Sequence, residues 1–470
     1  MSYSKKLNSI FKASWDCQAV QSDDRCLTYK EFYELAFSLT KFLESKNKKS
    51  GDVIGIKLQN GLEYCIAYLA CLIGNYVVVP INLELSKKEQ DFIIRMSQPS
   101  FLIDEEIDFF NLAHEKCERP DFKDSVQDYD AIFFTSGTTG NPKGVCHSME
   151  SLIENATSFN KMLDLKNDVR MYHVLPMAYM AGFLNTIISP LIAGGCILIG
   201  PRFNPSHAMN FWDKAINWEA NSIWITPTLA SILVKFTRDK NIIKKVGSNM
   251  QNIFCGTAPL PEKLRKDFLF LFSQPLQESF GMSEILLVSA QSRKDAKKEL
   301  NVGSPLPKLK ISKRLFDGQE ELLINSPWAL KYYLIDGNKE YPLEDGYMPT
   351  GDIGEIKGDK LYITGRIKDL IIRGGINISP LSIENIILSE GGVDEVAVVG
   401  LPHEFWGEEI CACIVKKDLE DEESILKKVK NLCENEIADN MQPDKYIIVN
   451  DLPKNTNGKI LKNVLVKNLL

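Results

Sequence analysis

The chain has 470 residues, of which 44% are apolar and 25% charged, and its formal net charge is −7. This composition is typical of a globular protein with about three domains or lobes, and the negative charge argues against a nucleic-acid partner. The N-terminus lacks the apolar core of a signal peptide, and the longest apolar stretches, 64–81 and 184–200, are interrupted by Asn, Pro or Gly. We therefore expect a cytoplasmic protein in which both stretches are buried helix-plus-strand segments and not membrane spans.

The eleven cysteines include no Cys-x-x-Cys pair. An odd number without framework spacing indicates free thiols in a reducing compartment. Cys411 and Cys413 alternate within an apolar stretch, so we expect both on one face of a strand. The five histidines are scattered along the sequence, which argues against a zinc site.

Helix and strand patterns alternate through the first two thirds of the chain. A helix is expected to open at 27–31, because apolar residues recur at helical spacing from Phe32 to Leu39. Strands are expected at 53–56, 77–80, 223–225 and 253–255. This alternation predicts an α/β fold with mostly parallel, helix-covered sheets, whose ligands lie beyond the carboxyl ends of the strands.

The pattern changes after residue 320. Short, turn-rich strands between 320 and 365 predict a β-subdomain, and a small α/β unit follows it. In that unit Ser379 is expected to N-cap a helix that has Pro380 in first position and stops at Gly391-Gly392. Further expected elements are a strand at 396–399, a helix at 422–437 and a strand at 446–449. We place the domain boundary at Lys368, which divides the chain into residues 1–367 and 368–470.

The most informative run is 134–145, Phe-Thr-Ser-Gly-Thr-Thr-Gly-Asn-Pro-Lys-Gly-Val, which follows a short apolar strand pattern. Glycine allows positive φ and close approach of a ligand, so backbone N–H groups, the hydroxyls of Ser136, Thr138 and Thr139, and the Lys143 ammonium can converge on a polyphosphate. Neither a GxxxxGK[ST] P-loop nor a GxGxxG fingerprint occurs in the chain. The alternative interpretation is a flexible Ser/Thr/Gly linker.

This run resembles the phosphate-binding signature of the acyl-adenylate-forming superfamily, which includes acyl-CoA synthetases, aryl-CoA ligases, luciferases and peptide-synthetase adenylation domains. Five further motifs follow in the family's order, so the resemblance extends from about Leu27 to Lys462. It implies a large N-terminal domain of two helix-covered, mostly parallel sheets with a β-subdomain, and a small, mobile C-terminal α/β domain.

The run Gln277–Glu284 places a hydroxyl beside a carboxylate in a glycine-containing turn, a combination suited to phosphate and a hard cation. It resembles the family's Tyr-Gly-x-Thr-Glu motif, with Phe for Tyr and Ser for Thr. The resemblance implies that Glu284 holds Mg²⁺, that Ser283 contacts the α-phosphate and that Phe280 packs on adenine. The alternative for Glu284 is a carboxylate at the N-terminal end of a helix.

Two runs near the proposed domain boundary resemble the family's next motifs. In Thr-Gly-Asp, the resemblance implies that the carboxylate of Asp352 binds the ribose hydroxyls. In the run 365–380, it implies that Arg366 contacts ribose or phosphate, that Lys368 is the hinge, and that Gly374 and Gly375 let backbone approach a pantetheine arm. The alternatives are an ordinary Gly-Asp turn and a surface hairpin followed by a capped helix.

The run 452–462 resembles the family's C-terminal Pro-Lys-Thr-x-x-Gly-Lys-Ile, with Asn455 where Thr is commoner. The resemblance implies that Lys459 is the catalytic lysine, whose charge offsets the negative charge of two anions that meet. The alternative is a solvated lysine, since other lysines lie nearby.

The run 175–182 resembles the family's Leu-Pro-x-x-His-x-x-Gly motif, with Tyr179 in place of the histidine. The resemblance implies that Tyr179, Phe183 and Cys255 line an acyl pocket. The alternative for Tyr179 is an ordinary core residue. The nucleotide-binding residues implied by the whole set of motifs are Thr135, Ser136, Gly137, Thr138, Thr139, Gly140, Lys143, Gly256, Thr257, Ala258, Pro259, Phe280, Gly281, Met282, Asp352 and Arg366.

The resemblance predicts an ATP-dependent acid–thiol ligase that uses ATP, Mg²⁺ and coenzyme A and activates a fatty or aromatic acid. Transfer to the phosphopantetheine of an acyl carrier protein is the nearest alternative. The short segment between Glu284 and Asn301 favours CoA, because fatty-acyl-AMP ligases often carry an insertion there. Further alternatives are a non-catalytic scaffold on the same fold and a luciferase-like oxidation. The presence of Lys459, Glu284 and Asp352 argues against the scaffold.

Overall fold

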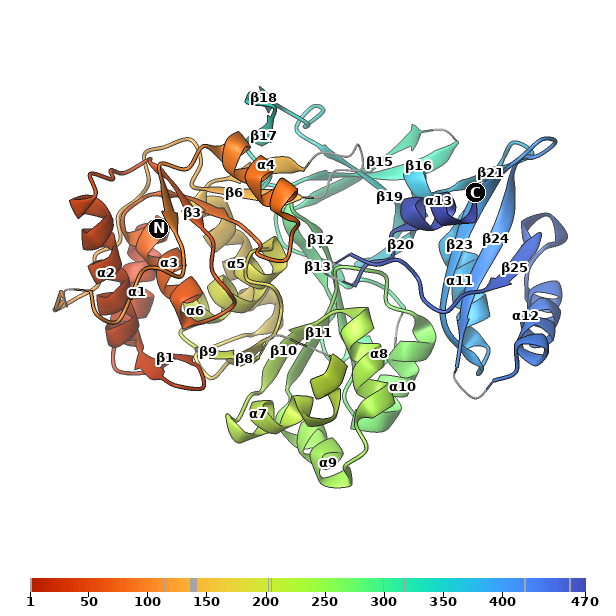
Figure 1. Ribbon diagram of the computed structural model, residues 1–470, viewed down its shortest axis with the longest axis horizontal. Helices are drawn as coiled ribbons and strands as arrows, with labels where there is room; N and C mark the ends of the chain where they lie inside the picture. Colours follow the sequence, from red (N-terminus) through yellow and green to blue (C-terminus); the bar gives the residue numbers. More distant parts are fainter. Residues whose placement is uncertain are drawn as a thin grey trace.

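The computed structural model describes residues 2–112, 115–135, 142–201, 203, 205–298, 300–316, 318–417, 420–455 and 458–470. The strands among these residues form four β-sheets. The N-terminal helices lie at one end of the long axis of the molecule, and the C-terminal elements gather at the opposite end (Figure 1). The α/β architecture expected from the sequence is confirmed.

A seven-stranded sheet lies in the N-terminal half of the chain. Its central strands run parallel, and the edge that receives later strands is antiparallel. In sheet order its strands are β18 (Asn338–Glu340), β17 (Tyr332–Ile335), β7 (Lys143–His147), β6 (Ala131–Thr135), β4 (Val77–Pro80), β3 (Val53–Ile56) and β5 (Phe101–Ile103). The strands expected at 53–56 and 77–80 are therefore confirmed.

A nine-stranded sheet follows, also parallel at its centre and antiparallel at both edges. Its strands in sheet order are β14 (Ser304–Pro305), β13 (Leu286–Ala290), β12 (Gln277–Met282), β11 (Asn252–Cys255), β10 (Ser222–Ile225), β8 (Arg170–His173), β9 (Cys196–Ile199), β1 (Gln18–Gln21) and β2 (Cys26–Thr28). Strands β10 and β11 contain the strands expected at 223–225 and 253–255.

Helices cover these two sheets. They are α1 (Tyr3–Ala13), α2 (Tyr29–Ser45), α3 (Leu62–Ile73), α4 (Lys87–Ser97), α5 (Met149–Leu163), the π-helix η1 (Ala181–Ile188), α6 (Ser189–Ala193), the 3₁₀ turn η2 (Pro205–Asn210), α7 (Phe211–Asn217), α8 (Pro227–Phe236), α9 (Lys240–Asn249), α10 (Glu262–Phe272) and the 3₁₀ turn η3 (Asp295–Lys297). Helix α2 begins where expected because Thr28 and Glu31 form a capping box. Both long apolar stretches are buried helix-plus-strand segments, as expected.

The largest apolar cluster lies between the two sheets and includes Phe32, Phe133, Phe183 and Trp224. A second cluster packs α7 to α10 against the other face of the nine-stranded sheet. No helix among the described residues has the length and apolar character needed to cross a membrane.

The β-subdomain is a four-stranded antiparallel sheet of β15 (Lys310–Phe316), β16 (Gln319–Asn325), β19 (Met348–Lys357) and β20 (Lys360–Arg366). It shares an apolar cluster with Ile285, Val288 and Tyr333, which come from the two larger sheets. The β-subdomain is thereby attached to the strands that carry the Glu284 motif.

The C-terminal part holds a five-stranded sheet of β21 (Ile371–Arg373), β22 (Ile376–Ile378), β23 (Val393–His403), β24 (Gly407–Lys416) and β25 (Lys445–Ile448). Its helices are α11 (Pro380–Ser389), α12 (Glu422–Glu436) and α13 (Lys462–Leu469), with 3₁₀ turns η4 (Ile367–Asp369) and η5 (Asp439–Met441). The helices expected at 380 and 422 are confirmed, whereas the strand expected at 396–399 is much longer because β23 pairs with β24 along its whole length.

One capping prediction is confirmed in position only, because Ser379 is the N-cap residue of α11 but makes no side-chain capping hydrogen bond. The Ser379 side chain does not cap α11, although Pro380 opens the helix as expected. Its Oγ instead donates to the carbonyl of Thr364 at 2.8 Å, which ties the helix to β20. The cysteine prediction is confirmed: all eleven are free, and Cys411 and Cys413 lie on one face of β24 with their Sγ atoms 4.0 Å apart.

The C-terminal part contacts the side of the nine-stranded sheet that carries α8 and α10 (Figure 1). Lys235 Nζ lies 3.0 Å from Asp394 Oδ2, and Lys263 Nζ donates to the carbonyl of Glu390 at 3.1 Å. The segment that leads from β25 to α13 passes back to α8, where Gly458 accepts a hydrogen bond.

Candidate active site

The β6–β7 hairpin carries the predicted phosphate loop. Thr135 ends β6 and pairs in register with Lys143, which begins β7. The predicted phosphate-binding residues Ser136, Gly137, Thr138, Thr139 and Gly140 lie outside the described residues. Lys143 Nζ is 5.1 Å from the ring centroid of Tyr333, which belongs to β17 on the other side of β7. The hairpin therefore presents its lysine beside an aromatic residue from a distant part of the chain.

Glu284 lies in the turn between β12 and β13, next to that aromatic residue. The Tyr333 hydroxyl donates to Glu284 Oε1 at 2.7 Å, and the N–H of Leu330 donates to the Glu284 carbonyl at 2.7 Å. Burial, together with the Glu284 charge, raises the pKa of Tyr333, so the phenol remains a donor. The Tyr333 side chain thus contacts both residues, with Lys143 near its ring and Glu284 at its hydroxyl.

The neighbouring Ser283 is attached to β7 through a buried histidine. His147 Nε2 lies 2.6 Å from the Ser283 carbonyl. Burial lowers the pKa of His147 to about 4, so the ring is neutral at pH 7 and carries its proton on the nitrogen that faces the carbonyl. This bond holds the Ser283–Glu284 turn against the β6–β7 hairpin.

The predicted adenine-side residues follow β11. A Cβ on Gly256 would lie 2.8 Å from Ser279 Oγ, and one on Gly281 would lie 2.4 Å from the Leu286 carbonyl, so both close approaches require glycine. Thr257 has φ +73°. Ala258 and Pro259 continue this loop toward α10, while Phe280 and Met282 are half-buried and pack against the cluster shared with the β-subdomain.

Asp352 and Arg366 are opposite one another in the β19–β20 register. Arg366 Nε donates to Asp352 Oδ1 at 2.5 Å, and the Asp352 side chain is 2% exposed. The preceding turn is held by Glu321, which accepts the N–H of Gly351 at 2.8 Å. Burial opposes the charge of Arg366, but the Asp352 hydrogen bond and the charges of Asp352, Asp369 and Glu284 outweigh it and raise the pKa of the guanidinium. The Glu284 turn and the Asp352 strand therefore share one electrostatic environment.

Lys459 reaches the same place from the C-terminal part of the chain. Its N–H donates to Asn455 Oδ1 at 2.9 Å, and its carbonyl accepts the N–H of Asn455 at 2.9 Å. Burial, followed by the charges of Arg366 and Lys368, lowers the pKa of the ammonium to about 8. The nearby carboxylates of Asp369 and Asp352 act in the opposite direction. Lys459 is therefore a partly desolvated cation beside the Asp352–Arg366 pair.

The predicted acyl-pocket residues are not all brought together. The Tyr179 hydroxyl accepts a hydrogen bond from Asn82 Nδ2 at 3.1 Å, just before the π-helix η1. Phe183, buried in that π-helix, packs against Tyr68 with ring centroids 4.4 Å apart. Cys255 belongs to the cluster on the other face of the sheet, because successive side chains of β11 alternate between faces. It is Phe254 that points to the Phe183 side.

Lys368, the predicted hinge, and Gly374 and Gly375, the predicted thiol-tunnel residues, lie together at the start of the C-terminal part. Lys368 is in η4, where burial lowers its pKa. Gly374 and Gly375 have φ +58° and +82°, a backbone region that favours glycine, and a Cβ on Gly374 would lie 3.1 Å from the Trp406 ring. The glycine pair is thus required by backbone geometry whatever ligand it meets.

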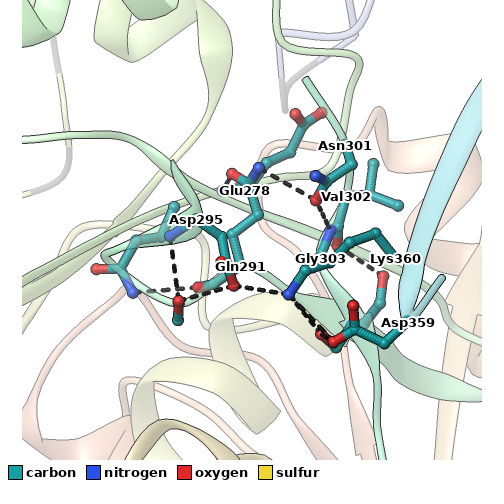
Figure 2. A network of polar contacts seen from close by, with 12 residues as sticks. Glu278, Gln291, Asp295, Asn301, Val302, Gly303, Asp359 and Lys360 are labelled. Carbon is teal, nitrogen blue, oxygen red and sulfur yellow. Dashed lines mark hydrogen bonds and ion pairs between the residues drawn. The ribbon is translucent and has the colours of Figure 1, made fainter. Parts of the chain in front are cut away.

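A polar network ties together the far ends of the strands that carry Glu284 and Arg366 (Figure 2). On β12, Glu278 pairs with Arg265, and its N–H donates to Gln291 Oε1 at 2.9 Å. Gln291 Nε2 donates to Asn301 Oδ1, which also accepts the N–H of Gly303 at 2.8 Å. Backbone bonds of Val302 and Gly303 with Leu361, and the contact of Lys360 with Asp295, complete the connection to β20.

The donor set fits a magnesium–nucleotide complex. Within the described ranges, no three His, Cys, Asp or Glu side chains gather in a way that would hold a metal ion by themselves. Mg²⁺ usually takes one or two carboxylates plus phosphate oxygens, so Glu284 beside Lys143 and the phosphate hairpin suffices. A carboxylate and cations on either side suit a triphosphate better than a neutral ligand.

Sequence reasoning missed Tyr333, His147 and Thr228. The last of these contacts the loop that carries Lys459. Tyr333 stands in an ordinary strand pattern, and only the pairing of β17 with β7 brings it to Glu284. His147 could have been noticed as a histidine in an apolar strand, but not its acceptor. These positions carry no local signal of function because each acts through a partner 49 to 230 residues away.

Comparison with known proteins shows the family of the chain. A family model of the AMP-binding enzymes matches residues 12–334, and a model of the AMP-binding enzyme C-terminal domain matches residues 382–459. The chain belongs to the AMP-binding enzyme family, the acyl-adenylate-forming class that its motifs resemble.

Particular relatives share nearly the whole length of the chain. The long-chain-fatty-acid–CoA ligase FadD13 of Mycobacterium tuberculosis is 29% identical over 94% of this chain and 93% of its own. The 2-succinylbenzoate–CoA ligase of Bacillus subtilis is 28% identical, with 94% and 93% covered, and the malonate–CoA ligase of Arabidopsis thaliana is 26% identical, with 100% and 90% covered.

Solved structures show the same architecture. ATP-bound MatB from Rhodopseudomonas palustris superposes with a TM-score of 0.86 at 25% identity and covers 100% of this chain and 99% of its own. The anthranilate CoA ligase AuaEII, in complex with anthranoyl-AMP, superposes with a TM-score of 0.90, and at 18% identity it supports the fold alone; 100% and 97% of the two chains are covered.

Proposed function

We propose that this protein is an ATP-dependent acid–CoA ligase that adenylates a fatty or aromatic carboxylic acid and transfers the acyl group to coenzyme A. The observation that carries the proposal is the convergence of Lys459 on the Asp352–Arg366 pair, beside the Glu284 turn. Cationic and carboxylate side chains from four distant segments then surround one nucleotide. The CoA ligases among the relatives support the same reaction class.

In the first half-reaction, a carboxylate oxygen of the acid forms a bond to the α-phosphorus of ATP. The bond from that phosphorus to the bridging oxygen breaks, and pyrophosphate leaves with the electron pair. Because two anions meet, positioning and charge neutralisation dominate the barrier. Lys459 stabilises the charge between acid and α-phosphate, Asp352 holds the ribose hydroxyls, and Thr135 and Lys143 flank the β- and γ-phosphates.

Glu284 would hold Mg²⁺, which would supply positive charge at the phosphate oxygens. The Tyr333 hydroxyl orients its carboxylate by donating to Oε1. Ser283, held by His147, faces the α-phosphate from the same turn.

In the second half-reaction, the sulfur of CoA forms a bond to the acyl carbon, and AMP leaves with the electron pair of the mixed anhydride. The proton of the thiol goes to solvent. We place the two domains at residues 1–367 and 368–470 and the hinge at Lys368, so that rotation withdraws Lys459 and presents Gly374 and Gly375. The aromatic rings of Tyr179 and Phe183 support an acid with an apolar tail.

A panel of carboxylic acids assayed for ATP–pyrophosphate exchange, with and without CoA, tests the proposal. Acid-dependent exchange followed by an acyl-CoA product and AMP is the expected result. Exchange with no CoA thioester would redirect the acyl group to a carrier-protein acceptor. Purified protein that gives no exchange with any acid would overturn the enzyme assignment.

A further inference from the structure

Among the described residues, the loop that carries Lys459 forms a hydrogen bond with the N-terminal part of the molecule at Thr228. Thr228 Oγ1, on α8, donates to the carbonyl of Gly458 at 3.0 Å across 230 residues of sequence. Gly458 is the residue directly before Lys459. Another contact between the two parts, Lys235 with Asp394, also starts from α8, but each of its side chains is more than a quarter exposed. Exposed ion pairs of that kind hold little free energy.

Helix α8 does not need the Thr228 hydroxyl for its own stability. The cap of this helix is Thr226, whose side chain accepts the N–H of Leu229 at 3.2 Å, and Pro227 occupies the first helical position. The hydroxyl two residues further on points instead to the Lys459 loop. One threonine therefore serves the helix and the other serves a partner outside it.

The approach of the two segments is close enough to require glycine. A Cβ on Gly458 would lie 2.7 Å from Thr228 Oγ1 and 3.0 Å from Thr228 Cβ, and Gly458 has φ +78°. The turn is also braced internally, because the N–H of Gly458 donates to the Asn455 carbonyl at 2.9 Å and the Asn455 side chain accepts the N–H of Lys459. These hydrogen bonds and the Thr228 contact hold the backbone directly beside Lys459.

We propose that Thr228 is a positioning residue for adenylation, whose hydroxyl docks the Gly458 turn so that Lys459 is directed at the Asp352–Arg366 pair. The inference rests on the proposed function, in which Lys459 acts in the first half-reaction only. A contact that exists in the adenylation arrangement and not after the C-terminal part rotates affects one half-reaction selectively. A merely structural threonine affects both halves together or neither.

The test compares Thr228→Val, which keeps the shape and removes the donor, with Thr228→Ser, which restores it. Loss of one hydrogen bond predicts a fall of several-fold to about tenfold in the rate of acid-dependent pyrophosphate exchange for Thr228→Val. Thioester formation from a supplied acyl-adenylate stays at the wild-type rate, and Thr228→Ser recovers most of the exchange. An equal loss in both half-reactions, or no loss in exchange, would overturn the inference.

Thr226→Val is the matched control, since it removes a hydroxyl from the same helix without touching the Gly458 turn. It is expected to lower the melting temperature through loss of the cap, with no selective loss of exchange. A selective loss of exchange in this variant would assign the effect to α8 itself and contradict the role of Thr228.

A second readout does not depend on the substrate. Modification of Lys459 by an amine-acylating reagent, mapped by peptide mass, is expected to be several-fold faster in Thr228→Val than in the wild type. Unchanged protection would refute the docking role. If Thr228 governs this protection while no acid is adenylated, the docking contact stands and the proposed function falls.

Discussion

Two arginine–carboxylate pairs in this protein differ in what surrounds them. In the first, Arg265 meets Glu278 beneath α10, and both side chains are almost fully enclosed, at 7% and 11% exposed. In the second, Arg366 meets Asp352 at the end of β20, and the arginine side chain is 32% exposed. Both carboxylate side chains are largely sequestered from solvent, at 11% and 2% exposed, whereas the two arginine side chains differ, at 7% and 32%.

The first pair is completed by neutral amides. Arg265 Nη1 donates to Gln291 Oε1 at 2.9 Å, and the same oxygen accepts the N–H of Glu278. Burial raises the pKa of Glu278 to about 7, against the opposing effect of Arg265. Such a pair fixes the position of β12 and leaves no room for a ligand.

The second pair is surrounded by further charges. Lys459, Lys368, Asp369 and Glu284 all influence Arg366 or one another electrostatically. The same two chemical groups therefore have different roles in the two places. Where amides enclose the pair, it stabilises the structure. Where one member remains accessible beside other cations and anions, the pair forms part of a candidate binding site.

The largest effect is expected from the cation beside the second pair. Lys459→Ala should lower the rate of pyrophosphate exchange by about 10²–10³-fold, as loss of one preorganised charge in a catalytic site does. Thioester formation from a supplied acyl-adenylate should be spared. The control is Lys454→Ala, because Lys454 lies in the same segment and pairs with Glu395 at 2.6 Å. Equal loss in both half-reactions would refute the role of Lys459.

Breaking the first pair should cost stability. Arg265→Met leaves the buried Glu278 carboxylate without its partner, so we expect the free energy of unfolding to fall by about 3–5 kcal/mol. Denaturant unfolding measures this change. Adding Glu278→Gln removes the unpaired charge and should recover part of the loss. A single variant as stable as the wild type would show that the amides alone hold β12.

Changing the second pair should affect binding more than stability. Asp352→Asn weakens charged hydrogen bonds to the ribose, so KM for ATP should rise by about 10–100-fold. The free energy of unfolding should change less than in Arg265→Met, because Arg366 keeps access to water. Steady-state kinetics and denaturant unfolding of one preparation test both statements. An unchanged KM would remove Asp352 from the nucleotide site.

The smallest change is expected from pH. Burial lowers the pKa of Lys459 to about 8, so its charged form is complete well below that pH and is lost as pH rises through it. In the free enzyme, kcat/KM for adenylation should therefore fall about tenfold per pH unit above about pH 8. Lys459→Arg, which remains protonated, should flatten this limb of the profile. A wild-type profile that is flat to pH 10 would contradict the assignment.

Much of the fold follows from local pattern. The capping box at Thr28 starts α2, Pro380 starts α11, and the short apolar runs at 53–56 and 77–80 are strands, because propensity and periodicity act within a few residues. Ser379 stands at the expected N-cap position, but its hydroxyl donates to the Thr364 carbonyl of β20 and accepts no helix N–H.

The candidate site was only partly predictable. The motif residues Glu284, Asp352, Arg366 and Lys459 could be named in advance, and the structure brings them together. Cys255 was expected beside Phe183, yet strand alternation turns it to the opposite face of the sheet. The acyl-pocket prediction rested on order along the chain, which does not specify the face.

The sequence by itself determined the class of enzyme, the alternation of helices and strands, and the residues predicted to meet the nucleotide. Only the tertiary structure decided that Tyr333 orients Glu284, that His147 is neutral and holds Ser283, and that Thr228 docks the turn before Lys459. The physical reason is the distance along the sequence between the residues that interact. Periodicity and capping are properties of neighbouring residues, whereas these contacts arise from strand pairing and domain docking across 49 to 230 residues of chain.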